Sequence, residues 1–442
     1  MMDSTAASSA ELFDRACEVM PGGNTRTTVW HAPHPIYAAS GQGCRIKDVD
    51  GKTYLDFINN YTSMIHGHAN PVVAEAVRKQ LEIGTCFAMP TESEIELAEL
   101  LCKRSPGFER VRFTNSGSEA VMMALKAARA HTGKPKIAKC EGAYHGSYDF
   151  AEVSLDSAPE SWGNADPNSV AYTSGTPRSV LDEVIVIPFN RVEETENILA
   201  AHADDLACVL IDPMPNRAGL IPATPEYLEM LRRFTTNNDM LLVFDEVISF
   251  RLGHGGAQGE FNVSPDLTAL AKIIGGGFPI GAVAGTAEVM KVFDPRQGKP
   301  LAPHGGTFNA NPISMVAGKA AMELLTPEEF DRINGLGGRA RGGLTKAIAD
   351  AGVEGQITGA GSLLRIHMTS VPLVDYRSAR ATATQSAALS SVIDKMHANG
   401  VLLAETGLCA ISTAMGETEI DEFIDIFADA LASTGQPRHA AE

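Results

Sequence analysis

Five short apolar segments of this 442-residue chain are each followed by side chains that could do chemistry. In chain order the segments are VRFT, KIAKC, CVLI, MLLVF and LTALA, and the groups that follow them are Ser116-Gly117-Ser118, Tyr144 with His145, Asp212, Asp245 and Lys272. Ligands of an open parallel sheet bind at the carboxyl ends of its strands. If the segments are parallel strands of one sheet, these groups face a single crevice.

Lys272 closes a segment that is otherwise apolar. A buried lysine is rare, and burial lowers its pKa and leaves a nucleophilic amine, as Schiff-base chemistry requires. The alternative is a lysine whose stem is buried and whose ammonium reaches the surface. The glycines of 275–277 allow a close approach of the backbone to a ligand. Because they do not fit GxGxxG, they give little support to a dinucleotide site.

An anion and a cation are expected at two of the other strand ends. Ser116-Gly117-Ser118 opens a helix, where free N–H groups, hydroxyls and the helix dipole favour a phosphate. The alternative is a plain serine cap of the first turn. Asp245 ends an apolar strand, where a carboxylate needs a partner. A protonated pyridine nitrogen is one such partner, and a structural ion pair or a helix cap is the alternative.

The elements that must position these groups alternate between helix and strand. From about residue 70, helical periods such as VVAEAVRKQL alternate with short β-branched segments, which is typical of parallel strands covered on both faces. The chain is therefore predicted to be an α/β protein with a large, mostly parallel-sheet domain over 70–310. A small α+β domain would combine residues 1–69, including a hairpin that turns at Asp50-Gly51, with residues 311–442.

Composition narrows the classes of partner. The net charge of −18 disfavours nucleic acid, which such a surface would repel. The seven scattered cysteines form no CxxC pair, so neither a metal site nor a disulfide framework is expected. We find no secretory signal and no apolar stretch long enough to span a membrane, and we expect a cytoplasmic protein.

Taken together and in this order, the motifs resemble a known family. NSGSEA, YHG, FDEV, DLTALAKIIGGGFPIGA and HGGTFNANPIS are similar to segments of the fold-type I, class III aminotransferases. The resemblance is strongest to the branch that contains glutamate-1-semialdehyde aminomutase and the β-phenylalanine aminotransferases, and it runs from PGGNTR to the last helix. It implies an enzyme that depends on pyridoxal 5′-phosphate (PLP).

The resemblance also implies a role for each matching residue. Lys272 would bind PLP as a Schiff base and shuttle a proton, and Asp245 would pair with the pyridinium nitrogen. Thr307 would reach the phosphate of the neighbouring subunit, which implies a homodimer. The residues placed around the cofactor are Ser116, Gly117, Ser118, Glu119, Tyr144, His145, Asp245, Val247, Lys272 and Thr307. Of these, Glu119 and His145 have supporting roles that the resemblance does not specify.

The substrate is indicated less directly. PGGNTRTTV is similar to the segment that binds the substrate carboxylate in this branch, which makes Arg26 the candidate clamp and Trp30 a candidate pocket residue. The alternative for Arg26 is a surface arginine. Arg217 lies in the unusual segment PNRAG and either adds a second positive charge or faces solvent. The late loop reads ETGLCAIS, with Thr406 where the β-phenylalanine enzymes have an arginine.

Three functions follow as hypotheses. The first is a transaminase that passes an amino group from a β- or other non-standard amino acid or amine to a keto acid, by a ping-pong mechanism. The second is an isomerase, either an aminomutase of the glutamate-1-semialdehyde type or a racemase. The third, a PLP-binding regulator, normally needs an appended DNA-binding segment, and this sequence shows no basic extension.

Overall fold

The computed structural model describes residues 7–433, and a seven-stranded sheet forms its centre. In spatial order the strands are β4 (Arg110–Thr114), β10 (Gly281–Gly285), β9 (Leu267–Ala271), β8 (Leu241–Asp245), β7 (Leu206–Ile211), β5 (Lys136–Cys140) and β6 (Val184–Ile187). All neighbouring pairs from β9 to β6 are parallel, whereas β10 is antiparallel to both β9 and β4. The predicted strand ends therefore share one edge of the sheet.

Strand β7 shows why these segments fold as buried strands. All six of its residues are buried. Cys208 and Leu210 pack in the cluster that contains helix α5 (Gly117–Thr132), whereas Val209 and Ile211 pack in the cluster that contains α9 (Pro225–Asn237). Because successive side chains point to opposite faces, a strand covered on both faces must be apolar throughout.

Strand β10 is the one strand of this sheet that the sequence did not predict. Its sequence, GAVAG, has small residues of low β-propensity. The structure explains them by close packing, because a Cβ atom on Gly281 would lie 2.1 Å from the backbone oxygen of Ser116. The large sheet is accordingly mixed rather than wholly parallel.

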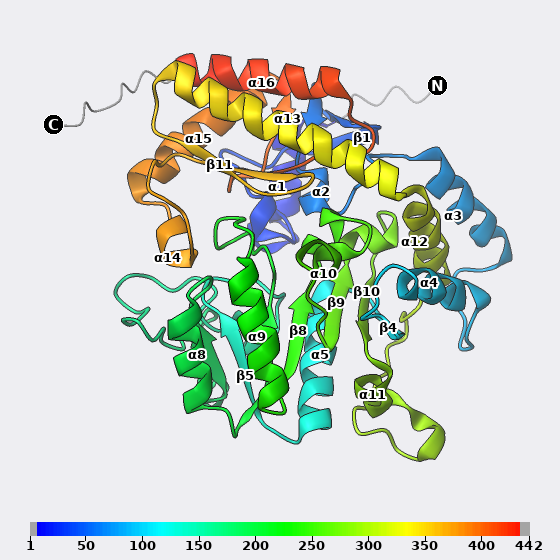
Figure 1. The fold of residues 1–442 in the computed structure, drawn as a ribbon. Helices are drawn as coiled ribbons and strands as arrows, with labels where there is room; N and C mark the ends of the chain where they lie inside the picture. The colour runs from blue at the N-terminus through cyan, green and yellow to red at the C-terminus, as the bar shows by residue number, and fades with distance from the viewer. Residues whose placement is uncertain (1–6, 434–442) are drawn as a thin grey trace.

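The second part of the fold lies beyond the carboxyl edge of the sheet. It contains a four-stranded sheet and a three-stranded sheet, and the long helices α13 (Pro327–Ala351) and α16 (Glu417–Ala432) lie side by side across it (Figure 1). The strands, in spatial order, are β1 (Ala38–Gln42), β2 (Arg45–Asp48), β3 (Thr53–Asp56) and β13 (Val401–Leu402), then β11 (Gln356–Thr358), β12 (Leu363–His367) and β14 (Leu408–Ala410). Strands β2 and β3 form the predicted hairpin around Asp50-Gly51. The predicted domain boundaries at 69 and 310 remain a prediction.

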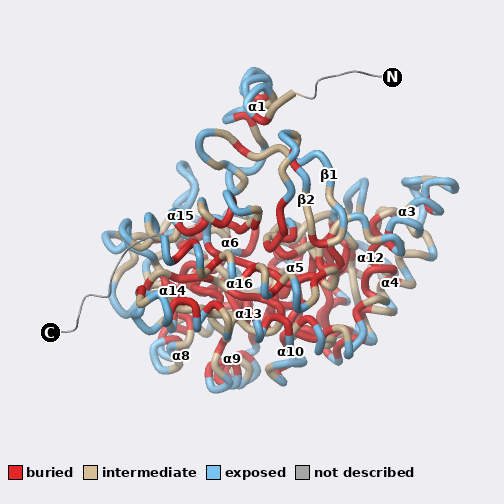
Figure 2. The backbone as a smooth tube through the Cα atoms, turned by 90° about the horizontal axis from the view of Figure 1, so that it is seen from above, coloured by how far each residue is buried: buried red, intermediate tan, exposed pale blue. Residues whose placement is uncertain are grey.

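The other helices pack around these sheets or connect them. They are α1 (Ser9–Cys17), α2 (Asn59–Thr62), α3 (Pro71–Ile83), α4 (Glu92–Cys102), α6 (Asp149–Glu152), α7 (Arg178–Asp182), α8 (Val192–Ala201), α10 (Gly256–Phe261), α11 (Ala287–Met290), α12 (Pro312–Leu324), α14 (Tyr376–Ala379) and α15 (Ala383–Ala398). Helix α1 stands out from the body with mostly exposed positions (Figure 2). Within residues 7–433, no helix is long and apolar enough to cross a membrane.

Candidate active site

A cavity of about 410 Å³ opens at the shared carboxyl edge of the large sheet. It is lined by residues from every strand end that the sequence singled out. These lining residues are Ser116, Gly117, Ser118, Tyr144, His145, Asp212, Asp245, Val247 and Lys272. The wall is completed by Asn60, Ser63, Asn115, Gly146, Ile248, Ala271 and the segment 277–280.

Lys272 follows β9 directly and has left-handed backbone dihedrals, with φ of 52°. A non-glycine residue in this region costs energy, and such strain is concentrated at functional sites. The side chain reaches into the cavity, where Nζ donates a hydrogen bond of 2.8 Å to the backbone oxygen of Tyr61. Burial lowers the pKa of the Lys272 ammonium to about 8, which brings its neutral, nucleophilic form into the physiological range.

Asp245 ends β8, and its buried carboxylate is held from two sides. Oδ1 accepts a hydrogen bond of 3.0 Å from the backbone N–H of Val247. Oδ2 lies 2.8 Å from Nδ1 of His145, which is also buried. Because burial lowers the pKa of His145, the ring is neutral and donates from Nδ1. Its Nε2 atom has no hydrogen-bond partner in the described chain.

The start of α5 forms a second polar wall of the cavity. The side chain of Ser116 accepts from the backbone N–H of Glu119, as the sequence predicted for a cap. No protein group in residues 7–433 accepts from the N–H groups of Gly117 or Ser118, which belong to the first helical turn. A Cβ atom on Gly146, whose φ is +87°, would lie 2.4 Å from Oγ of Ser118. Only glycine therefore fits the loop that closes over this helix start.

Asp212, which follows β7, lines the same cavity as expected for a strand-end group, although no role in the site was predicted for it. Its Oδ1 atom accepts from the backbone N–H of Met214. Burial raises the pKa of Asp212 well above its usual range, and the neighbouring charge of Asp245 adds to the rise. Burial therefore favours the protonated form of Asp212.

Glu246 is the neighbour of Asp245 in sequence and is fully buried, but its contacts stabilise the fold and do not reach the cavity. Its carboxylate accepts from the backbone N–H of Ala257 at 2.6 Å and from the side chain of Gln258 at 2.9 Å. It does not line the cavity, because successive residues leaving a strand point to opposite sides.

Three of the predicted residues line neither this cavity nor the one beside it. Glu119 accepts from the backbone N–H and side chain of Asn115. Thr307 is exposed, in a surface hollow beside Cys86. Arg217 pairs with Asp156 at 3.3 Å and lines neither this cavity nor the next one described. The predicted roles of these three residues remain predictions.

A second cavity, also of about 410 Å³, adjoins the first. Arg26 and Trp30 line it together with Ile58 and Tyr61, so that its wall is largely apolar with a guanidinium at its margin. Asn60 lines both cavities, and its Oδ1 atom accepts a hydrogen bond of 2.9 Å from Nη1 of Arg26. The predicted carboxylate clamp therefore lies beside the space that contains Lys272.

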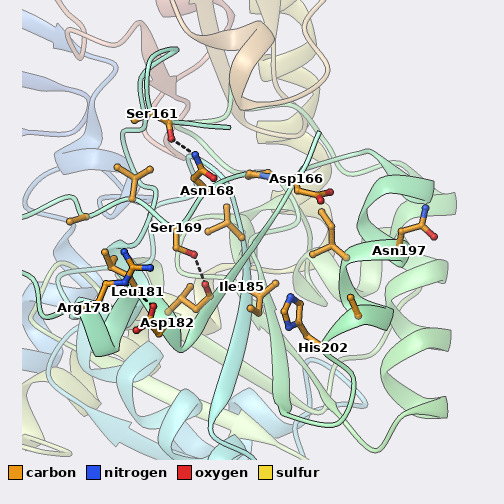
Figure 3. Close-up of a pocket in the computed structure, with 17 residues that line it drawn as sticks. Ser161, Asp166, Asn168, Ser169, Arg178, Leu181, Asp182, Ile185, Asn197 and His202 are labelled. Carbon is orange, nitrogen blue, oxygen red and sulfur yellow. Dashed lines mark hydrogen bonds and ion pairs between the residues drawn. The ribbon is translucent and has the colours of Figure 1, made fainter. Parts of the chain in front are cut away.

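A larger cavity, of about 770 Å³, lies elsewhere, along the edge strand β6 (Figure 3). Two of its polar side chains pair with each other, Arg178 with Asp182, and Asn168 donates to the backbone of Ser161. None of the strand-end groups described above lines it. Chemistry therefore belongs to the smaller cavity at the carboxyl edge. Among the described residues, no cluster of His, Cys, Asp and Glu could hold a metal ion.

Comparison with known proteins assigns the chain to a family. The model of the class III aminotransferases matches residues 27–431. The chain is 41% identical to a glutamate-1-semialdehyde 2,1-aminomutase from Methanothermobacter thermautotrophicus, over 85% of this chain and 87% of that one. An omega-transaminase from Sphaerobacter thermophilus superposes with a TM-score of 0.93 at 54% identity, covering 96% of this chain and 97% of that one.

A β-phenylalanine aminotransferase from Variovorax paradoxus superposes with a TM-score of 0.88 at 32% identity, over 98% of this chain and 96% of that one. The chain belongs to the class III aminotransferases, which are PLP-dependent enzymes. The predicted fold class, family and cofactor are confirmed.

The residues of the cavity fit that cofactor. The unpaired N–H groups of Gly117 and Ser118 suit its phosphate, and the loop at Gly146 leaves the helix start clear. The Asp245 carboxylate suits a protonated ring nitrogen, and Lys272 supplies the amine that can bind an aldehyde.

Proposed function

We propose that this chain is a transaminase that transfers an amino group from a β-amino acid, or from another non-standard amino acid or amine, to a keto acid by a ping-pong mechanism. The observation that carries the proposal is the arrangement of Lys272, Asp245 and the start of α5 around one cavity, in a chain 54% identical to an omega-transaminase.

Each of these groups has a task that its surroundings suit. When bound, PLP supplies an electrophilic carbonyl and an electron-poor ring that stabilises negative charge on the substrate carbon. Val247 and His145 donate hydrogen bonds to the Asp245 carboxylate, which holds it in place to pair with the ring nitrogen. Lys272, with a pKa near 8, can both accept a proton and return it, and the Tyr61 carbonyl holds its amine at a fixed place in the cavity. Tyr144 and Val247 line the walls on which the ring would pack.

The adjoining cavity indicates the substrate class. An apolar wall with Trp30, and Arg26 at its margin, suits a donor that carries a hydrophobic group and a carboxylate. The similarity to a β-phenylalanine aminotransferase supports the same class. Arg217, paired with Asp156, gives no second contact in this arrangement.

A homodimer is part of the proposal. Phe87, Met89 and Phe308 are 43%, 73% and 59% exposed. They lie in or next to the hollow that contains Thr307. Exposed apolar residues gathered in this way mark protein interfaces. Light scattering should give twice the chain mass, and Thr307→Ala should weaken PLP binding. A cytoplasmic location is also proposed, and cell fractionation would test it.

The runner-up function is an isomerase of the aminomutase type, which the 41% identity to a glutamate-1-semialdehyde 2,1-aminomutase favours. The two functions differ in their need for a second substrate. A transaminase turns over only when a keto acid is supplied, whereas an aminomutase converts its substrate without one. Donor consumption, measured with and without pyruvate or 2-oxoglutarate, separates them, and turnover that is independent of any keto acid would contradict the proposal.

A further inference from the structure

The wall between the two cavities is a left-handed turn. Asn59, Asn60, Tyr61 and Thr62 have φ of 49°, 46°, 54° and 74° in succession, and none of them is glycine. Single asparagines visit this region readily, but runs of such residues are costly. A strained turn persists only when its surroundings fix it, and such turns are concentrated at functional sites.

Contacts from both parts of the fold fix this turn. Asp56 accepts from the backbone N–H groups at its start, and the side chain of Asn59 donates to Ala410 in the three-stranded sheet. The fully buried guanidinium of Arg251 donates to the backbone oxygen of Thr62. The hydroxyl of Tyr61 donates to the backbone oxygen of Thr28. The turn therefore presents one face to Lys272 and the other to the segment that contains Arg26.

The hydrogen bonds of Ser63 determine which way the Asn60 amide points. Oγ of Ser63 donates its one hydrogen to the backbone oxygen of Asn60, at 2.9 Å. It can therefore only accept from the side chain of Asn60, whose Nδ2 atom lies 3.1 Å away. With Nδ2 committed to Ser63, Oδ1 must face Arg26, at 2.9 Å from Nη1.

We propose that Asn60 is a positioning residue that sets the preference for carboxylated donors, by holding the Arg26 guanidinium with a neutral acceptor at the wall shared by the two cavities. The inference rests on the proposed role of Arg26 as the carboxylate clamp. A neutral acceptor uses one N–H of the guanidinium and leaves its charge and remaining donors for a substrate carboxylate.

Aspartate at this position should abolish the preference, because it has the same size and also tolerates left-handed dihedrals. Its carboxylate would pair with Arg26 and compete with the substrate. Asn60→Gly removes the amide, and glycine tolerates left-handed dihedrals. This variant therefore separates loss of the contact with Arg26 from pairing of a carboxylate with the Arg26 guanidinium. Asn24→Asp is the matched control, because Oδ1 of Asn24 accepts from the backbone N–H of Arg26, not from its guanidinium.

The experiment uses the PLP-loaded enzyme with β-phenylalanine and with 1-phenylethylamine, which is the same amine without its carboxylate. The specificity ratio is kcat/KM for the first donor divided by kcat/KM for the second. Binding of 3-phenylpropanoate, measured by calorimetry, gives a second reading that needs no turnover. We expect Asn60→Asp to lower the ratio at least tenfold, mainly through KM, and to weaken 3-phenylpropanoate binding by a similar factor.

We expect Asn60→Gly to have a smaller effect than Asn60→Asp, and Asn24→Asp to change the ratio less than threefold. In an Arg26→Ala background, Asn60→Asp should have no further effect on the ratio. If Arg26→Ala lowers the ratio but Asn60→Asp does not, the role of Asn60 is wrong and the clamp stands. If Arg26→Ala leaves both the ratio and 3-phenylpropanoate binding unchanged, the clamp itself is wrong and the inference falls with it. Equal losses for both donors, with loss of the bound cofactor's absorbance, would make Asn60 merely structural and overturn the proposal.

Discussion

Replacing Asp245 with asparagine should disable the enzyme while leaving it folded. Asparagine fills the same space but has one acceptor and one donor where the carboxylate has two acceptors. The wild-type carboxylate faces donors on both sides, the N–H of Val247 and Nδ1 of His145. If the new NH₂ group faces Val247 it meets the backbone N–H, and if it faces His145 the ring proton must move from Nδ1 to the unpaired Nε2 atom. The charge that would balance a protonated ring nitrogen is lost as well.

The size of the loss follows from the burial of the site. Removing one partner of a buried charge pair costs about 3–5 kcal/mol. If this cost falls on the transition state, it corresponds to roughly a 10²- to 10⁴-fold reduction in kcat/KM. Asp245 is only 4% exposed, so little solvent screening reduces the effect. We therefore expect Asp245→Asn to retain less than one hundredth of the wild-type kcat/KM.

The assay is steady-state turnover of an amino donor with a keto acid, with the absorbance of bound PLP recorded for each sample. Glu246→Gln is the matched control, because Glu246 is equally buried and adjacent but contacts Ala257 and Gln258 instead of the cavity. Among molecules that fold and bind PLP, this control should keep most of its kcat. Activity of Asp245→Asn within tenfold of the wild type would refute the role given to Asp245.

Three further predictions concern the amine, the phosphate cradle and the fold. Burial lowers the pKa of Lys272, so in the PLP-free protein the acylation rate of its amine should rise with pH and level off above about 8. The acylation rate of an ordinary lysine continues to rise up to about pH 10.5. Peptide mass spectrometry would measure the rate at Lys272, and a rise that continues well beyond about pH 8 would contradict the prediction. Gly146→Ala should weaken PLP binding roughly tenfold or more in a titration, because left-handed alanine costs about 1–2 kcal/mol and the methyl group meets Ser118. Gly133→Ala is the control and should leave PLP binding unchanged, because Gly133 is also left-handed but its added methyl group would meet no other atom. In helix α13, Gly342→Ala should raise the free energy of unfolding by about 0.5–1 kcal/mol, because glycine inside a helix is less stable than alanine. Gly337→Ala should lower the free energy of unfolding, because the added Cβ would lie 2.1 Å from the Gly361 oxygen. Thermal denaturation would measure both variants, and equal changes for Gly337→Ala and Gly342→Ala would contradict the packing of this helix.

The strand ends could be predicted from the sequence because an apolar strand that stops at a polar residue is a local signal. Lys272 and Asp245 each break such a run, and the shared direction of parallel strands then places them together. Strand β10 could not be predicted, because its small residues have little local propensity for strand. They are required instead by close packing against the backbone of Ser116.

Contacts between segments that are distant in the chain also could not be predicted from the sequence. His145 was identified by its motif, but its bond to Asp245 joins residues 100 positions apart. Asp212 was expected at the crevice as a strand-end group, but its interaction with Asp245 could not be predicted, because it depends on the order of β7 and β8 in the sheet. Asn60 gave no signal, because a left-handed run held by Arg251 and Ala410 depends on contacts from elsewhere in the chain. Thr307 faces outward in a single chain, so its predicted role requires a partner.

The central claim is that Lys272 is the residue that binds PLP, and reductive trapping tests it most directly. Lys139 on β5 is a second lysine whose pKa burial lowers to about 8, and its amine donates to two backbone oxygens. Borohydride reduction of the yellow holoenzyme, followed by peptide mass spectrometry, should find the cofactor on Lys272, and Lys272→Ala should lose both the trapped product and turnover. Cofactor trapped on Lys139, or trapping that survives Lys272→Ala, would contradict the account.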